Sequence, residues 1–201
     1  MGLFSRKSDT ATITATAPTA QDLSHLTGAY TIDPAHSEIG FAVRHAMVTT
    51  VRGQFSEYEG KLHLDGSDPS RSTAEVVIKV ASIDTGQEQR DGHLRTGDFF
   101  EAETYPEITF RSTSARQLDA ETYQLTGDLT IKGTSKPVSI DLTFNGSAKD
   151  PYGTQRVGFE GTTTINRTDW GLNYNAALET GGVLIGEKVK LTFDISAIKS
   201  A

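Results

Sequence analysis

The sequence predicts an all-β protein whose antiparallel strands form a barrel or a sandwich. From Tyr30 onward, apolar and polar residues alternate along the chain, which is the pattern of strands with one apolar face. Clusters of turn residues separate these stretches, as at 65–70 (DGSDPS), 132–137 (KGTSKP) and 149–154 (KDPYGT). One segment, residues 87–96, has the features of a helix instead. Many short strands, regular turns and a single short helix together indicate this fold class.

Composition excludes several kinds of protein. The 201 residues fit one large domain or two small ones, and 36% of them are hydrophobic, enough for a substantial core. The chain has no cysteine, which rules out disulfides, a thiol nucleophile and a zinc–thiolate site. The formal net charge of −7 argues against nucleic acid as a partner, and more weakly against docking on anionic lipid.

The beginning of the chain differs from the rest. Residues 8–26 are rich in Thr and Ala with little apolar bulk, so we expect a disordered tail at 1–27 and a folded domain at 28–201. Arg6 and Lys7 are not followed by the apolar stretch of a secretory signal. No run approaches the roughly 20 apolar residues of a membrane-spanning helix. On this basis we expect a cytoplasmic location.

The same alternation of apolar and polar residues predicts each strand. In HSEIGFAVRH (36–45), one side of the strand carries Ile39, Phe41, Val43 and His45. The pattern recurs at 30–33, 52–65, 74–82, 108–118, 122–133, 136–148, 155–167 and 187–198. The apolar faces are rich in Phe and β-branched residues, namely Phe41, Val43, Phe55, Val76, Ile78, Phe110, Phe144, Phe159 and Phe193. Alternation alone does not distinguish a closed core from a cavity for a ligand.

The one predicted helix spans about Gln87 to Thr96. Thr85 and Glu88 have the spacing of a capping box, and Gly97 is a suitable stop. The only large apolar residue in this helix is Leu94, so it is a poor core helix and fits a surface connection or a lid.

A few polar and aromatic residues are candidates for function. His45 shares the apolar face of its strand and is either a hydrogen-bonded core residue or a polar contact for a ligand. Arg90, Asp91 and His93 cluster on the helix, where an Arg–Asp pair could hold the helix to the barrel or Arg90 and His93 could meet a polar headgroup.

Two aromatic segments accompany them. Phe99 and Phe100 follow the helix and either plug the core or line a pocket at one end of the barrel. Trp170 lies in a polar bend with Arg167 and Asp169, and we expect it to cover a barrel end while the Arg–Asp pair fixes the bend. The sequence contains no HExxH, GxSxG or phosphate-loop motif, and we predict no cofactor and no bound metal.

Several segments together resemble the YceI-like family of lipocalin-like, polyisoprenoid-binding proteins. They are YTIDPAHSEIGFAVRH (30–45), VRGQFSEYEG (51–60), SIDTGQEQRDGHLRTGDFF (82–100), YPEITFRS (105–112), LTGDLTIKGTSKPV (125–138), INRTDWGLNYNAALETGG (165–182) and VKLTFDI (189–195). The resemblance covers roughly Ala29 to Ala197. It implies an eight-stranded antiparallel lipocalin-like barrel with one short helix and an elongated apolar tunnel for a long isoprenoid or similar chain. Some members of the family form dimers, so a homodimer is a further expectation.

The first functional hypothesis is therefore a non-enzymatic protein that binds a long-chain amphiphilic lipid, a polyisoprenoid or an isoprenoid quinone, for storage or transport. The residues expected to contact it are Phe41, Val43, His45, Phe55, Val76, Ile78, Arg90, His93, Leu94, Phe99, Phe100, Phe110, Phe159, Trp170 and Phe193. One alternative is an enzyme that uses the barrel as a pocket, with His45, His93 or Asp91 in acid–base roles. Another is an interaction domain whose barrel is filled by its own side chains.

Overall fold

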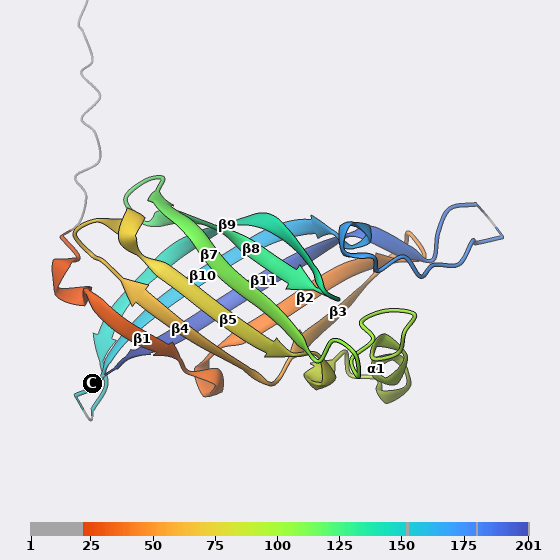
Figure 1. Cartoon of the computed structure of the whole chain (residues 1–201), viewed down its shortest axis with the longest axis horizontal. Coiled ribbons are helices and arrows are strands. Elements are labelled where there is room, and N and C mark those ends of the chain that lie inside the picture. The colour runs from red at the N-terminus through yellow and green to blue at the C-terminus, as the bar shows by residue number, and fades with distance from the viewer. Residues whose placement is uncertain (1–21, 152, 180, 201) are drawn as a thin grey trace, which may run out of the picture.

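The computed structural model describes residues 22–151, 153–179 and 181–200. Its strands belong to one antiparallel sheet (Figure 1). They are β1 (Gly28–Ile32), β2 (Glu38–His45), β3 (Thr49–Phe55), β4 (Tyr58–Leu64), β5 (Thr73–Lys79), β6 (Ile83–Asp84), β7 (Glu107–Gln117), β8 (Thr122–Ile131), β9 (Thr134–Lys149), β10 (Gln155–Asn166) and β11 (Ile185–Lys199).

The sheet closes on itself as a barrel. Neighbouring strands follow the order β1-β4-β5-β7-β8-β9-β10-β11, and β1 then pairs with β11 through Tyr30 and Lys199. This ring confirms the predicted eight-stranded antiparallel barrel. Closure leaves no free edge in the ring, which removes the main route by which sheets aggregate.

Three of the barrel strands are bent and interrupted rather than continuous. β1 and β2 both pair with β11, on either side of the 3-10 turn Pro34–His36. β4 pairs with β1 while β3 pairs with β2, so these two also act as one bent strand, broken at residues 56–57. β5 and β6 likewise act as one bent strand, because β5 pairs with β4 and β6 pairs with β3. The sheet is therefore longer than any of these short strands.

The helix α1 (Glu88–Leu94) lies at one end of the barrel, beside the start of β7 (Figure 1). Its position confirms the predicted helix, but the predicted cap is wrong. The N-cap residue is Gln87 without a side-chain bond, because the hydroxyl of Thr85 binds the carboxylate of Asp91 instead. The helix also ends before Gly97, with Arg95 at its C-cap.

The described part of the chain begins inside the segment expected to be a tail. Ser24–Leu26 forms a 3-10 turn, and Leu26 is buried against Tyr30, whose hydroxyl donates to the Leu26 carbonyl at 2.7 Å. Residues 22–27 therefore pack with the barrel, while residues 1–21 of the predicted tail lie outside the described residues. Within the described ranges, no helix is long and apolar enough to cross a membrane.

Candidate ligand-binding cavity

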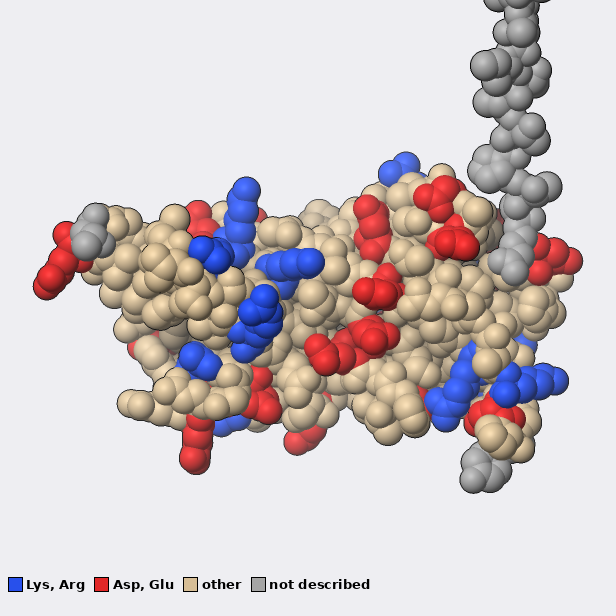
Figure 2. All heavy atoms as spheres, turned by 180° about the vertical axis from the view of Figure 1, so that it is seen from behind, with Lys and Arg blue, Asp and Glu red and all other residues tan. Residues whose placement is uncertain are grey.

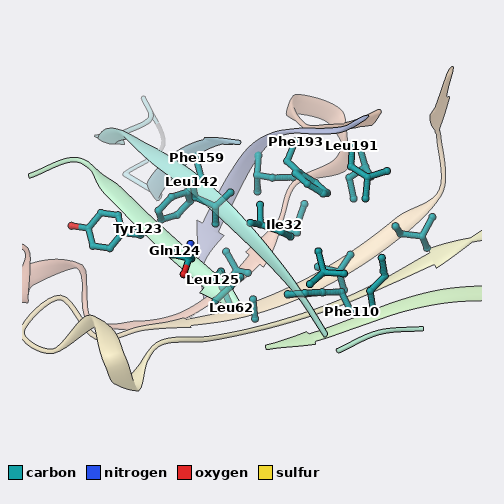
Figure 3. A pocket seen from close by; sticks show the side chains of 18 of the residues that line it. Ile32, Leu62, Phe110, Tyr123, Gln124, Leu125, Leu142, Phe159, Leu191 and Phe193 are labelled. Atoms are coloured by element: carbon teal, nitrogen blue, oxygen red, sulfur yellow. The ribbon is translucent and has the colours of Figure 1, made fainter. Parts of the chain in front are cut away.

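The interior of the barrel contains an apolar cavity of about 630 Å³. Its volume lies within the roughly 300–1,000 Å³ that is usual for small-molecule sites. Side chains from β1 to β5 and from β7 to β11 form the wall, so the cavity lies within the barrel rather than on its outer surface. Figure 3 shows Phe110, Leu142, Phe159, Leu191 and Phe193 directed into this common space.

Aromatic rings lie toward both ends of the cavity. Near α1, the rings of Phe41 and Phe55 have centroids 5.8 Å apart, and Phe55 meets Phe100 edge-on at 6.2 Å. Toward the other end, Phe144 and Phe159 lie 5.4 Å apart. These offset and edge-on arrangements are the favourable ones for aromatic pairs. Between them the wall is mainly aliphatic, so the cavity offers continuous apolar contact along the barrel.

Glycines allow the wall side chains to lie close to the sheet. A Cβ atom on Gly53 would lie 2.4 Å from Cζ of Phe41, and one on Gly127 would lie 2.6 Å from Cζ of Phe110. Gly161 stands in the same relation to Leu142, with 2.6 Å to Cδ2. Each glycine thus frees the space that a large side chain of a neighbouring strand occupies.

Most of the residues expected from the sequence do line this cavity. The wall includes Phe41, Val43, Phe55, Val76, Ile78, Leu94, Phe99, Phe100, Phe110, Phe159 and Phe193. Their contact with a ligand stays a prediction, but their common position follows from the period-two alternation of the strands.

Four expected residues lie outside the wall: His45, Arg90, His93 and Trp170. His45 ends β2 at the rim of the barrel, opposite Thr49 and Ile185, because the alternation that places Val43 inside continues past the end of the cavity. His93 lies on the outer part of α1, with Nε2 2.8 Å from the Asp98 carboxylate and its ring edge-on to Phe99.

The polar residues of α1 attach the helix to the barrel through hydrogen bonds and do not form part of the cavity wall. The carboxylate of Asp91 accepts from the backbone N–H of Thr85 at 3.0 Å and from its hydroxyl. Arg90 donates to the Thr85 hydroxyl at 2.7 Å and to its carbonyl at 2.8 Å. The expected Arg–Asp pair is therefore wrong in detail, since both residues bind Thr85. Arg95 adds bonds to the carbonyls of Ala81 and Ile83, both 2.9 Å.

The bend at residues 166–172 is also organised differently from the expectation. Arg167 is 4% exposed and donates to the carbonyls of Leu172, Gly186 and Ile185 rather than pairing with Asp169. Burial lowers the pKa of its guanidinium, although the nearby Glu187 opposes this. Arg167 lines one end of the cavity and holds both ends of the segment 172–186. Trp170 is buried nearby, and its indole N–H donates to the Leu129 carbonyl at 3.0 Å.

The opposite end of the cavity carries polar and more exposed residues. Tyr123 and Gln124 line it from the start of β8, with Gln117 from the end of β7 and Asp65 after β4. In Figure 3 the Tyr123 hydroxyl points away from the apolar side chains. Burial of its ring raises the pKa of Tyr123. A ligand with one polar group would find hydrogen-bond partners at the ends of the cavity, not along its middle.

Sequence reasoning missed much of the aliphatic wall. The further residues include Ile32, Leu62, Ile108, Leu125, Ile131, Ile140, Leu142, Ile165, Val189, Leu191 and Ile195. The signal was present, because each lies on the inward phase of an alternating strand. The choice of wall residues from the sequence favoured aromatic side chains and so passed over the aliphatic ones. The break between β1 and β2 also shifts which residues of the alternating pattern face inward.

Three comparisons with known proteins agree with this architecture. The family model for the YceI-like domain matches residues 30–197. A UPF0312 protein of Staphylococcus aureus (strain N315) is 41% identical over 169 residues, covering 84% of this chain and 95% of that protein.

Two solved structures have the same fold. The crystal structure of Burkholderia cenocepacia BcnA superposes with a TM-score of 0.73 at 24% identity, covering 82% of this chain and 98% of that one. A polyisoprenoid binding domain from Saccharophagus degradans superposes with a TM-score of 0.65 at 18% identity, covering 85% and 98%. With the family model matched over nearly the whole barrel, the chain belongs to the YceI-like domain family.

Proposed function

We propose that this protein binds a long-chain amphiphilic lipid, a polyisoprenoid or an isoprenoid quinone, inside the barrel for storage or transport. The observation that carries the proposal is the apolar cavity of about 630 Å³ that the barrel strands surround. Membership of the YceI-like family supports it, as does the likeness in fold to a domain described as polyisoprenoid-binding.

The energetics favour a chain-like ligand. Each buried methylene stabilises a complex by about 0.8 kcal/mol, so a long chain needs no strong polar anchor. Ordering of the chain offsets part of this gain, which keeps the affinity within the usual range. An aliphatic wall with polar groups only toward its ends fits a long apolar chain that ends in a small polar group.

The placement of the acid–base candidates favours binding over catalysis. His45, Asp91 and His93 would have to reach a substrate in the cavity, but none of them lines it. The Asp91 carboxylate already accepts a hydrogen bond from Thr85, and the His93 ring is hydrogen-bonded to the Asp98 carboxylate. The third hypothesis, a barrel filled by its own side chains, fits poorly with a cavity of this volume.

A pair of carboxylate substitutions tests the proposal. Phe41→Asp places a charge on the cavity wall, where an apolar chain cannot solvate it, so we expect loss of lipid retention. Val77→Asp is the matched control, because Val77 lies between the wall residues Val76 and Ile78 and does not line the cavity. Binding of a fluorescent polyprenyl or fatty-acyl probe would be measured for both, with circular dichroism to verify folding. Equal retention by a folded Phe41→Asp variant and by the wild type would refute the assignment of this wall.

A further inference from the structure

Two turns at the Arg167 end of the barrel expose large apolar side chains. Met47 is 61% exposed and Val48 80% exposed at the β2–β3 turn, and Val183 is 40% exposed in the segment 172–184. The two turns are neighbours, since the backbone N–H of Ala46 donates to the Leu184 carbonyl at 2.7 Å. In Figure 1 both project from the same end of the barrel. Met47, Val48 and Val183 together form a surface that we call the apolar tip.

Turn geometry does not explain these residues. Ala46 and Met47 are the central residues of a turn closed by the bond from the Val48 N–H to the His45 carbonyl, and their φ values are 49° and 62°. Hairpin turns with positive φ at both central positions normally have Asn and Gly there. A methionine here is unfavourable for the backbone and leaves its side chain in water. The choice of residue therefore points to something that covers the apolar tip.

Basic side chains lie directly behind the apolar tip. Arg44, Arg52, Lys188 and Lys190 are exposed on the outer face of β2, β3 and β11, where Arg52 and Lys190 both lie opposite Ala42. Within the described parts of the chain, none of the four has a carboxylate within 4.0 Å. Figure 2 shows a group of Lys and Arg on this half of the face, with Asp and Glu toward its middle and further acidic side chains at the extreme end. We call Arg44, Arg52, Lys188 and Lys190 the basic collar.

The apolar tip also adjoins the cavity. Val43, three residues before Ala46, lines the cavity, and so does Ile185, which directly follows Leu184. Acidic side chains occur at both ends, with Asp119 and Glu121 in the β7–β8 turn at the far end and the exposed Glu179 in the segment 172–184. The end that carries the apolar tip thus differs from the other in its greater apolar exposure and in the basic collar behind it.

We propose that the apolar tip and the basic collar dock this end of the barrel on the surface of a bilayer that contains anionic lipid. Apolar side chains enter the headgroup region while Lys and Arg face the phosphates, which is the usual combination for peripheral membrane binding. Three apolar side chains on two turns are too few for a stable protein interface, which needs about 800 Å² from each partner. The proposal goes beyond lipid binding in the cavity, because docking uses only the outer surface.

The test is flotation of the purified protein with vesicles of phosphatidylcholine alone and of phosphatidylcholine with phosphatidylglycerol. We expect binding to the anionic vesicles that weakens with added salt. The double variant Met47→Asn, Val48→Thr should lose it while keeping the fold, because Asn tolerates positive φ. Leu118→Asn is the control, an exposed apolar residue (44%) at the opposite end.

Charge reversal tests the basic collar separately. Arg52→Glu with Lys190→Glu should weaken binding by more than tenfold, since each basic residue near an anionic surface contributes roughly a factor of five. Lys61→Glu with Lys149→Glu, at exposed positions outside the collar, should change it little. The Phe41→Asp variant should still float, which separates docking from occupancy of the cavity.

Two outcomes would overturn the proposal. One is a wild-type protein that ignores anionic vesicles or binds them equally well after the substitutions in the apolar tip. The other is a dimer in sedimentation equilibrium that the substitutions Met47→Asn and Val48→Thr convert to a monomer, without vesicle binding by the wild type. That result would identify the apolar tip as an interface between copies of this chain.

Discussion

Glycines beneath large side chains set the shape of the cavity wall at the scale of single residues. A Cβ atom on Gly127 would lie 2.5 Å from the Arg111 carbonyl oxygen and 2.7 Å from Cα of Ser112, besides its contact with Phe110. Because two of these atoms belong to the backbone, no side-chain movement can relieve the overlap. The sheet itself would have to move.

Gly127→Ala is therefore expected to lower the free energy of unfolding by roughly 1–3 kcal/mol, the usual cost of overpacking. Urea unfolding followed by circular dichroism would measure it. Gly92→Ala is the matched control, because a Cβ atom on Gly92 in α1 meets nothing within 4 Å. That variant should be neutral or up to about 1 kcal/mol more stable, since alanine favours helices. A Gly127→Ala variant as stable as the wild type would contradict the described packing.

Asp33 holds the bend between β1 and β2. Its carboxylate accepts from Nη1 of Arg156 at 2.6 Å, lies 2.8 Å from Nδ1 of His36 and caps the turn through the Ala35 N–H. The bond from Arg156, followed by the one from His36, lowers the pKa of Asp33. Its ionised form is therefore favoured by the folded state.

The pH dependence of stability follows from this shift. A carboxyl whose pKa is lower in the folded state stabilises the fold above its unfolded pKa of about 3.9, and the contribution is lost as the pH falls through the lowered value. Asp33→Asn should thus be less stable than the wild type near neutral pH and approach it in acid. Thermal unfolding across this pH range would show it. A constant difference at all pH values would mean that the ionised carboxylate is not responsible.

Residue types alone predicted some of these roles and not others. Alternation placed Phe41 and Phe110 inside correctly, because a strand's two faces are fixed by its period. The role of Gly127 was not visible, since it depends on which strand lies beside it. Arg167 was expected to pair with Asp169, but buried carbonyls from residues distant in sequence bind it instead.

At the scale of elements, α1 and the segment after it form a cover fastened at few points. Leu94, Phe99 and Phe100 face the cavity, while Asp91, 6% exposed, ties the helix to Thr85. The helix has only seven residues, too few to be stable alone. Its order therefore depends on these tertiary bonds.

Asp91→Ala should release this cover. Loss of a buried acceptor that serves two donors costs roughly 1–3 kcal/mol, and the effect should be concentrated in α1. Hydrogen exchange would show faster exchange of the amides of residues 88–105, with the strands of the barrel little changed. Glu88→Ala, at an exposed position of the same helix, is the control. Unchanged exchange in the Asp91→Ala variant would argue against this fastening.

The elements were predicted better than their ends and interruptions. The alternation indicated the strands, and the unusual segment 87–96 indicated the helix. The break between β1 and β2 has a local signal, since Asp33 caps the turn and Pro34 opens it, and separate strands were expected on either side. The break between β3 and β4 at residues 56–57 lies inside the single stretch expected at 52–65, and it arises where the sheet bends around the barrel. The predicted capping box does not form, because the Thr85 hydroxyl binds the carboxylate of Asp91 instead. The capping-box spacing considers only Thr85 and Glu88, so it could not indicate this partner.

The molecule as a whole has two unlike ends joined by an apolar interior. The net charge of −7 argued weakly against anionic lipid, but it averages over the basic collar and the acidic residues elsewhere. Local charge, not the total, governs contact with a surface within a Debye length of about 10 Å. The arrangement of the strands reveals this difference because it brings residues 44, 52, 188 and 190 together.

Native mass spectrometry of the purified protein, followed by organic extraction and identification of what is released, shows whether the barrel holds a lipid. We expect one long-chain lipid per chain, lost on extraction and regained when a polyisoprenoid is added back. The Phe41→Asp variant should emerge bare from the same preparation. A wild-type protein that carries no lipid, and takes up none when offered isoprenoids, would rule out lipid binding in the cavity and leave the barrel as a scaffold for interactions on its outer surface.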